Sequence, residues 1–187
     1  MLGLTTGVLV LASCAGQAET GFQAGTVVAP GEVRIALAPD FLITVYQGEE
    51  ILGGEEVKFS ELLAQGRPVI LNFWAGLCPP CRAEMPDFQR VYDDFQDQVY
   101  LIGIDIGPFT GLGSRDDGRA LLKELKVTYP AGTTFDANVV KEYRIPGMPT
   151  TLFIKPNGEV VRAWAGILSQ TRMRELVEEL LRASSGM

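Results

Sequence analysis

Histidine is absent from this sequence of 187 residues. Its absence excludes catalysis by a Ser-His or Cys-His pair and any metal site built on histidine. It also excludes c-type haem attachment, which needs Cys-x-x-Cys-His, because the residue after Cys81 is Arg82. Any chemistry must therefore use thiols, carboxylates, lysines or backbone dipoles.

Basic segments are lacking as well. The net charge is −7, and no run of lysine or arginine occurs. Binding to nucleic acid requires a basic face, so nucleic acid is excluded as a partner. Hydrophobic residues make up 47% of the chain and charged residues 21%, as in ordinary globular proteins. The length fits one domain with a normal core and some additional tail.

The N-terminal apolar run over residues 4–12 is too short to span a bilayer, which takes about 20 residues. It suits the apolar part of a secretory signal. It leads into Leu11-Ala12-Ser13-Cys14, which resembles the lipobox of bacterial lipoproteins, whose cysteine becomes the lipidated N-terminus. An apolar stub with an unremarkable cysteine is the alternative. We expect a lipoprotein-type signal and anchor over residues 1–18, lipidation at Cys14 and membrane attachment through that lipid.

Residues 19–32 are rich in Gly, Ala, Thr and Val and are predicted to form a flexible tether before one domain over 33–187. Strands are predicted over 41–46, 57–59, 69–74, 99–106, 150–155 and 159–164. Helices are predicted over 61–65 with Ser60 as cap, from residue 78 to about 97, and over 116–126, 138–143 and 171–182. The glycine-rich stretch 107–113 is predicted to be a loop. Helices between buried strands indicate parallel pairing, and Pro156-Asn157-Gly158 indicates a late hairpin, so we expect an α/β domain with a mixed sheet.

Cys78 and Cys81 form a Cys-x-x-Cys pair, which can be a redox couple, half of a zinc site or a Cu(I) site. Zinc typically takes four Cys or His ligands, and the chain has only three cysteines and no histidine. Structural zinc is therefore disfavoured, and no metal is expected. Cu(I) needs only two thiolates and remains a minor alternative.

The position of the pair favours redox chemistry. It follows a predicted buried strand and begins a helix, where free N–H groups and the helix dipole stabilise the Cys78 thiolate. Pro79 and Pro80 lack N–H donors and suit the first helical turn. They hold the two sulfurs close and leave Cys78 the more exposed. Cys78 is therefore predicted to be the attacking nucleophile and Cys81 the resolving thiol.

Several motifs occur in an order typical of one family. They are Ala38-Pro39-Asp40-Phe41, Phe73-Trp74-Ala75 before the cysteines, Arg82-Ala83-Glu84-Met85-Pro86 after them, Gly147-Met148-Pro149-Thr150 and Pro156-Asn157-Gly158-Glu159. Over roughly residues 38–183 the chain resembles the thioredoxin-like TlpA/ResA/CcmG family. The resemblance implies a thioredoxin fold: a central mixed β-sheet flanked by helices on both faces, with an N-terminal β-hairpin extension.

The resemblance also implies roles for single residues. The Met148–Pro149 bond is expected to be cis and to face the Cys-Pro-Pro-Cys turn, where it would receive an extended peptide and block metal capture. A trans proline opening an edge strand is the alternative. Glu84 is expected near the thiols, where it would raise the thiol pKa and relay protons, or else to be a solvated helix charge. Trp74 is expected beside the turn, or simply in the core. Asn72 stands where thioredoxin has a buried Asp.

The family resemblance implies an extracytoplasmic, lipid-anchored reductant of protein disulfides, in apocytochromes c during their maturation or in copper-handling proteins. A membrane thiol donor would recharge it, and no cofactor is expected, because no flavin or nicotinamide motif occurs. Leu77 departs from the family, which usually has Trp before the first cysteine. A disulfide oxidase or isomerase, and a Cu(I)-binding or non-catalytic assembly protein, remain alternatives. The stretch 107–115 could be a partner-specific loop or mere surface.

Overall fold

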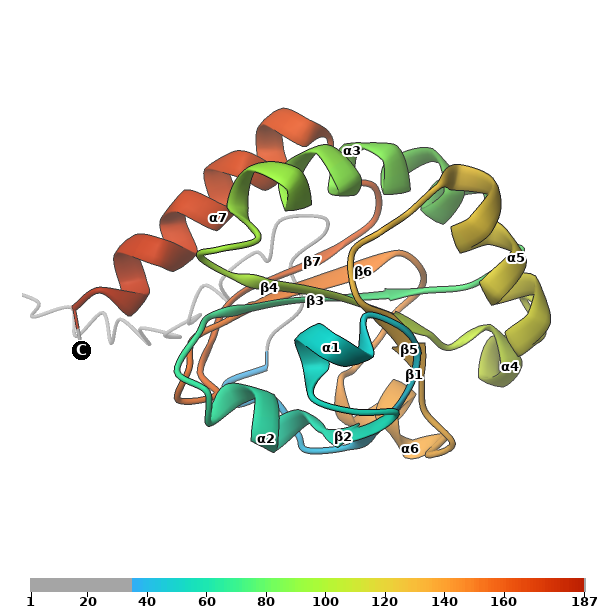
Figure 1. The fold of residues 1–187 in the computed structure, drawn as a ribbon, viewed down its shortest axis with the longest axis horizontal. Helices are drawn as coiled ribbons and strands as arrows, with labels where there is room; N and C mark the ends of the chain where they lie inside the picture. Colours follow the sequence, from blue (N-terminus) through green and yellow to red (C-terminus); the bar gives the residue numbers. More distant parts are fainter. Residues whose placement is uncertain (1–34, 187) are drawn as a thin grey trace, which may run out of the picture.

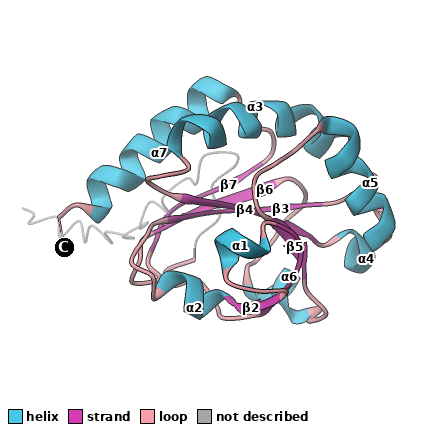
Figure 2. Ribbon diagram, in the orientation of Figure 1, coloured by secondary structure: helices cyan, strands magenta, loops and turns pink. Residues whose placement is uncertain are grey.

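The computed structural model describes residues 35–186, which form a seven-stranded mixed sheet with helices on both faces (Figures 1 and 2). The strand order is β2-β1-β5-β4-β3-β6-β7. β3 pairs in parallel with β4 and antiparallel with β6, and β4 pairs in parallel with β5. The strands are β1 (Leu42–Gln47), β2 (Glu56–Lys58), β3 (Val69–Trp74), β4 (Tyr100–Asp105), β5 (Ala131–Thr133), β6 (Thr150–Ile154) and β7 (Val160–Ala165).

Helices α3, α5 and α7 pack on one face of the sheet, and α1, α2 and α6 pack on the other (Figure 1). The helices are α1 (Glu49–Leu52), α2 (Phe59–Leu63), α3 (Pro79–Phe95), α4 (Gly107–Thr110), α5 (Arg115–Leu125), α6 (Asn138–Glu142) and α7 (Gln170–Ser184). The expected thioredoxin fold is thus confirmed. The N-terminal hairpin of β1 and β2 extends the sheet beyond β5, also as expected.

The buried central strand β3 separates two hydrophobic cores. Ile70 and Trp74 pack toward α3 and α7, whereas Leu71 and Phe73 pack toward α2 and α6. This alternation follows from the two-residue period of a strand. Asn72 has the same parity as Ile70 and Trp74, so its polar side chain is placed on the α3 face.

Three local expectations differ from the structure. The strand β5 was not predicted, because Ala131-Gly132-Thr133 has too few large side chains to give a strand signal. A Cβ at Gly132 would lie 2.5 Å from the backbone carbonyl oxygen of Thr44, so the close approach of β1 requires glycine. The stretch 107–113 contains the helical turn α4 rather than only a loop. Helix α2 begins at Phe59 with Lys58 as N-cap, and the Ser60 hydroxyl instead donates to Asp40.

Within residues 35–186, no helix is long and apolar enough to cross a membrane. The predicted signal and anchor over 1–18, Cys14 and the tether over 19–32 lie outside the described residues.

Candidate active site

The two cysteines lie where β3 passes into α3. Cys78 is the N-cap of α3, and Pro79 and Pro80 occupy the first turn of the helix. The sulfurs of Cys78 and Cys81 are joined in a disulfide, with their Cα atoms 5.3 Å apart. The backbone N–H of Cys81 donates to the Cys78 sulfur, with a distance of 3.3 Å between nitrogen and sulfur. The turn therefore brings the predicted redox pair together at a helix N-terminus.

Both cysteines are buried in this oxidised state. Cys78 is 2% exposed and Cys81 is 0% exposed, so the expected difference in exposure is small. Both belong to the hydrophobic core under α3, together with Trp74 and Met85. Trp74 is a core residue and lies in the same cluster as the Cys-Pro-Pro-Cys turn. Both expectations for it, a place beside the turn and a place in the core, therefore hold. A substrate sulfur that reacts with Cys78 must therefore contact the residues that surround it.

The Met148–Pro149 peptide bond is cis, as the family resemblance implies. Thr150, the next residue, pairs with Phe73 near the end of β3. The antiparallel register therefore places Pro149 at the same sheet edge as the Cys-Pro-Pro-Cys turn. The Pro149 carbonyl accepts the N–H of Gly166 at 2.8 Å, and Met148 packs against the core that contains the cysteines.

Glu84 is a buried carboxyl group on the α3 face that carries Cys81. It is 1% exposed, which excludes a solvated helix charge. Its Oε1 accepts from the Asn72 side-chain amide at 3.0 Å, and its Oε2 accepts from the Leu168 backbone N–H at 3.1 Å. Burial raises the pKa of Glu84 to about 8, although these two hydrogen bonds act in the opposite direction. The carboxyl group is therefore largely protonated at neutral pH.

Asp105, at the end of β4, is a second buried carboxyl group that the sequence reading missed. Its Oδ1 accepts from the Gly107 N–H at 2.9 Å, and its Oδ2 accepts from the Tyr46 hydroxyl at 3.2 Å. Burial is the main cause that raises the pKa of Asp105 to about 6. A charged residue inside an otherwise apolar strand was the available signal, since such a residue is rarely buried without partners.

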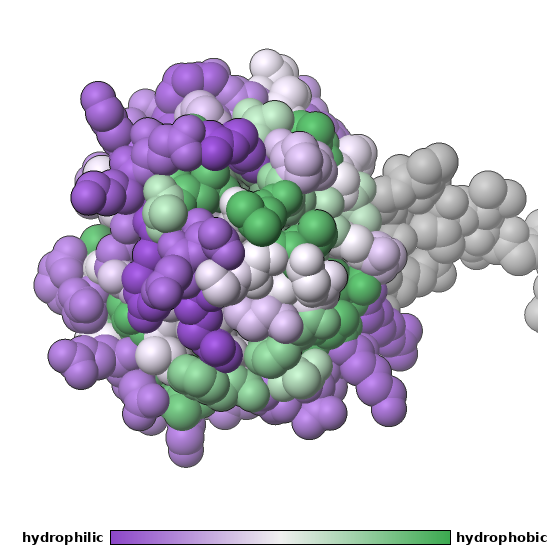
Figure 3. Space-filling model, turned by 90° about the vertical axis from the view of Figure 1, so that its right-hand side faces the viewer, coloured by the Kyte–Doolittle hydropathy of each residue, from purple (hydrophilic) through white to green (hydrophobic). Residues whose placement is uncertain are grey.

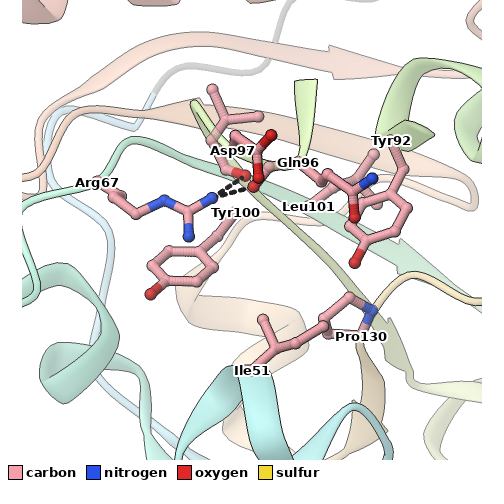
Figure 4. A pocket seen from close by; sticks show the side chains of 9 residues that line it. Ile51, Arg67, Tyr92, Gln96, Asp97, Tyr100, Leu101 and Pro130 are labelled. Atoms are coloured by element: carbon pink, nitrogen blue, oxygen red, sulfur yellow. Dashed lines mark hydrogen bonds between the residues drawn. The ribbon is translucent and has the colours of Figure 1, made fainter. Parts of the chain in front are cut away.

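A hollow of about 180 Å³ lies away from the cysteines, at the other ends of β3 and β4 (Figure 4). Its lining includes Tyr100 from the start of β4 and Tyr92 and Gln96 from the end of α3. Arg67 stacks on the Tyr100 ring with 4.1 Å between the guanidinium carbon and the ring centroid, and donates to the Val99 oxygen. Among residues 35–186, no group of three or more acidic, Cys or His side chains is arranged to hold a metal ion.

Sequence and structure comparisons find the same kind of relative. A sequence profile of the AhpC/TSA family matches residues 36–163. The chain is 34% identical to the thiol-disulfide oxidoreductase ResA of Oceanobacillus iheyensis, over 76% of this chain and 70% of that protein. It is 28% identical to ResA of Bacillus subtilis, over 93% of this chain and 90% of that protein. The crystal structure of StoA from Bacillus subtilis matches with a TM-score of 0.61 and 26% identity, over 76% of this chain and 99% of StoA.

These relatives agree with the geometry of the site. The matching profile covers strands β1 to β6, the start of β7 and both cysteines, and the relatives are named as thiol–disulfide oxidoreductases. Enzymes of this kind act on protein disulfides, which are therefore the substrate class of this chain. The chain belongs to the AhpC/TSA family and, within it, to the thioredoxin-like thiol–disulfide oxidoreductases of the ResA, CcmG and TlpA type.

Proposed function

We propose that this enzyme works as a reductant of protein disulfides outside the cytoplasm. One observation supports this direction of electron flow: few hydrogen-bond donors contact the Cys78 sulfur. Pro79 and Pro80 remove the N–H groups of the first two helical positions, and Cys81 supplies one N–H at 3.3 Å. A poorly stabilised thiolate makes the reduced form less stable, which lowers the reduction potential, whereas strong oxidants such as DsbA stabilise their reduced form.

Glu84 acts in the same direction in its ionised form, which becomes the main form only above its pKa of about 8. It lies three residues after Cys81 on the same face of α3, and both side chains are buried. When Glu84 ionises, its negative charge disfavours a thiolate nearby. In its neutral form it adds no positive charge that could stabilise one.

The reaction proceeds in two exchanges. The Cys78 thiolate attacks one sulfur of the substrate disulfide, which forms a mixed disulfide and releases the other substrate sulfur as a thiolate. Cys81 then loses its proton, to solvent or to the ionised fraction of Glu84, and attacks the Cys78 sulfur. This step forms the Cys78–Cys81 disulfide and releases the second substrate thiol. Two electrons pass to the substrate, and a membrane dithiol donor returns them to the enzyme.

The proposal includes the placement of the enzyme. Lipidation at Cys14, after a signal over 1–18, would anchor the chain, and a tether over 19–32 would hold the domain over 33–187 above the membrane. Substrates would then be oxidised cysteine pairs in exported proteins, such as apocytochromes c or copper-handling proteins. This part rests on the lipobox and on the family resemblance.

A trapping and turnover experiment tests the function. Cys81→Ser should accumulate a mixed disulfide between Cys78 and an oxidised protein substrate, because the resolving thiol is missing. Cys78→Ser, the matched control, should trap nothing. The reduced wild-type chain should cleave insulin disulfides, while the oxidised chain should fail to oxidise reduced, unfolded ribonuclease. Rapid oxidation of ribonuclease would instead identify a disulfide oxidase, and Cu(I) binding without turnover would identify a metal-binding protein.

A further inference from the structure

The segment between β4 and α5 contacts the residue just before the nucleophile. The Leu77 backbone N–H donates to the Leu112 carbonyl, with 2.8 Å between nitrogen and oxygen. Gly113 has a φ of +118°, and a Cβ added to it would lie 3.2 Å from Leu77 Cγ. The Leu77 side chain therefore lies against the glycine backbone of this segment. The contact is specific, since a larger residue at position 113 would displace it.

A buried carboxylate holds the segment in place. Asp105 is 0% exposed, and its Oδ1 accepts from the N–H of Gly107, the first residue of α4. The Gly107 carbonyl in turn accepts from the Leu112 N–H at 3.2 Å. Hydrogen bonds thus connect Asp105 to Leu112, and Leu112 to Leu77. Burying a carboxylate is costly unless it is hydrogen-bonded, and the bonds that Asp105 accepts from Gly107 and Tyr46 offset this cost and fix its position against the segment.

Two large apolar side chains are exposed at this contact, one on each side of the hydrogen bond between Leu77 and Leu112. Leu77 is 59% exposed and Leu112 is 38% exposed. The end of the molecule formed by α4 and α5, on the right of Figure 1, faces the viewer in Figure 3, where hydrophobic patches lie among hydrophilic side chains. Cys78 itself is almost fully buried. Leu77 directly precedes Cys78 and is exposed, so it is available to contact the residues that flank a substrate sulfur at Cys78.

We propose that Leu77 and Leu112 form an apolar shelf that binds the side chain next to the reactive cysteine of a polypeptide substrate. This inference rests on the proposed function and adds a specificity to it: cysteines flanked by an apolar residue react faster. Contact with such a residue removes apolar surface of both leucines from water, which favours binding. A polar flanking residue would not give this gain in free energy. Asp105 is a positioning residue, because it acts on the shelf through Gly107 and Leu112.

Single-turnover kinetics with two synthetic peptides test the shelf. The peptides differ only in a Leu or a Ser next to one cysteine, and each cysteine carries thionitrobenzoate in a mixed disulfide. The Cys78 thiolate of the reduced full chain attacks the peptide sulfur and releases coloured thionitrobenzoate, the better leaving group. Cys81 then displaces the peptide thiol and forms the Cys78–Cys81 disulfide. The readout is the ratio of the rate constants for the Leu and Ser peptides.

The wild-type chain should prefer the Leu peptide by about tenfold, which corresponds to about 1.4 kcal/mol. Leu77→Ser and Leu112→Ser should lower this ratio to about twofold or less. Leu37→Ser is the matched control, because Leu37 is 65% exposed and bridges to Glu159 at the hairpin after β6, far from the cysteines. That variant should keep the wild-type ratio. A wild-type ratio near one, or a ratio unchanged in both shelf variants, would overturn the shelf.

Two further arms separate the possible failures. The glutathione–thionitrobenzoate disulfide has no apolar flanking residue, so the wild-type chain and the Leu37→Ser control should react with it at similar rates, which shows that thiol exchange at Cys78 is intact. If the wild-type chain reacts with none of these disulfides, the proposed function fails together with the shelf. Asp105→Ala should lower the peptide ratio, and Asp105→Asn should restore it, because an amide oxygen can still accept the Gly107 N–H. An unchanged ratio in Asp105→Ala would refute the positioning role.

Discussion

The side-chain amide of Asn72 donates to Oε1 of Glu84 across 3.0 Å, beneath the helix that carries both cysteines. The same amide nitrogen lies 3.0 Å from the Thr151 hydroxyl on β6. Asn72 therefore connects the central strand, the cis-proline strand and the buried acid of α3. It cannot titrate, so Glu84 is the group in this cluster that changes charge with pH.

Glu84→Gln should remove a pH dependence of stability. The pKa of Glu84 is about 8 in the folded chain, above the usual value of 4.5. Between these values the folded state keeps a proton that the unfolded state has lost, so this stabilising contribution disappears as the pH rises toward 8. Urea unfolding should show the wild-type free energy of unfolding falling from pH 5 to 8 by up to a few kcal/mol relative to the variant.

Glu84→Gln is also expected to lose stability by an amount that does not depend on pH, so the two proteins are compared by how their free energy of unfolding changes with pH. Gln has one side-chain oxygen for the two donors, Asn72 and the Leu168 N–H, so one hydrogen bond is lost at every pH at a cost of about 1 kcal/mol. Only the difference between pH values reports the titration. Parallel curves for the two proteins from pH 5 to 8 would contradict a raised pKa of Glu84.

Asp105→Asn should remove a pH dependence of stability at lower pH than Glu84→Gln does. The folded pKa of Asp105 is about 6, above its usual 3.8, so the wild-type chain loses this contribution as the pH rises from about 4 to 6. The amide can still accept from Gly107 and can donate to the Tyr46 oxygen, so the fold should persist. The stability difference between variant and wild type should change below pH 7 and stay constant from pH 7 to 8. A difference that changes only above pH 7 would refute this assignment.

Gly118→Ala should destabilise the protein, although Ala usually stabilises a helix interior. A Cβ at position 118 would lie 2.3 Å from Oδ2 of Asp105, so α5 could not pack against this carboxylate. We expect a loss of about 1–3 kcal/mol, as for other overpacked sites. Gly147→Ala is the control for thermal unfolding, since nothing lies within 4 Å of its added Cβ. A stabilised Gly118→Ala variant would show that the packing around Asp105 is loose.

The sequence predicted those parts of the site that depend on neighbouring residues. Cys78, Cys81 and the prolines between them lie in one turn, and Pro149 could be recognised from its local motif. The burial of Glu84 could not be predicted, because it depends on Asn72 and on the Leu168 N–H from other elements.

The contact of Leu77 with Leu112 could not be predicted either, since it joins, through backbone atoms, the segments that follow the parallel strands β3 and β4. Backbone hydrogen bonds of this kind leave no trace in residue types. The strand β5 was missed for a related reason. Its small residues are selected by the close approach of β1 and not by a strand-forming pattern.

The equilibrium reduction potential of the Cys78–Cys81 pair tests the central claim most directly. The full chain would be equilibrated with mixtures of reduced and oxidised glutathione, and the fraction of disulfide measured by thiol alkylation. We expect a potential near or below about −220 mV, because few donors stabilise the Cys78 thiolate. A potential near about −120 mV, the value for the oxidant DsbA, would contradict the account and make this enzyme a disulfide donor.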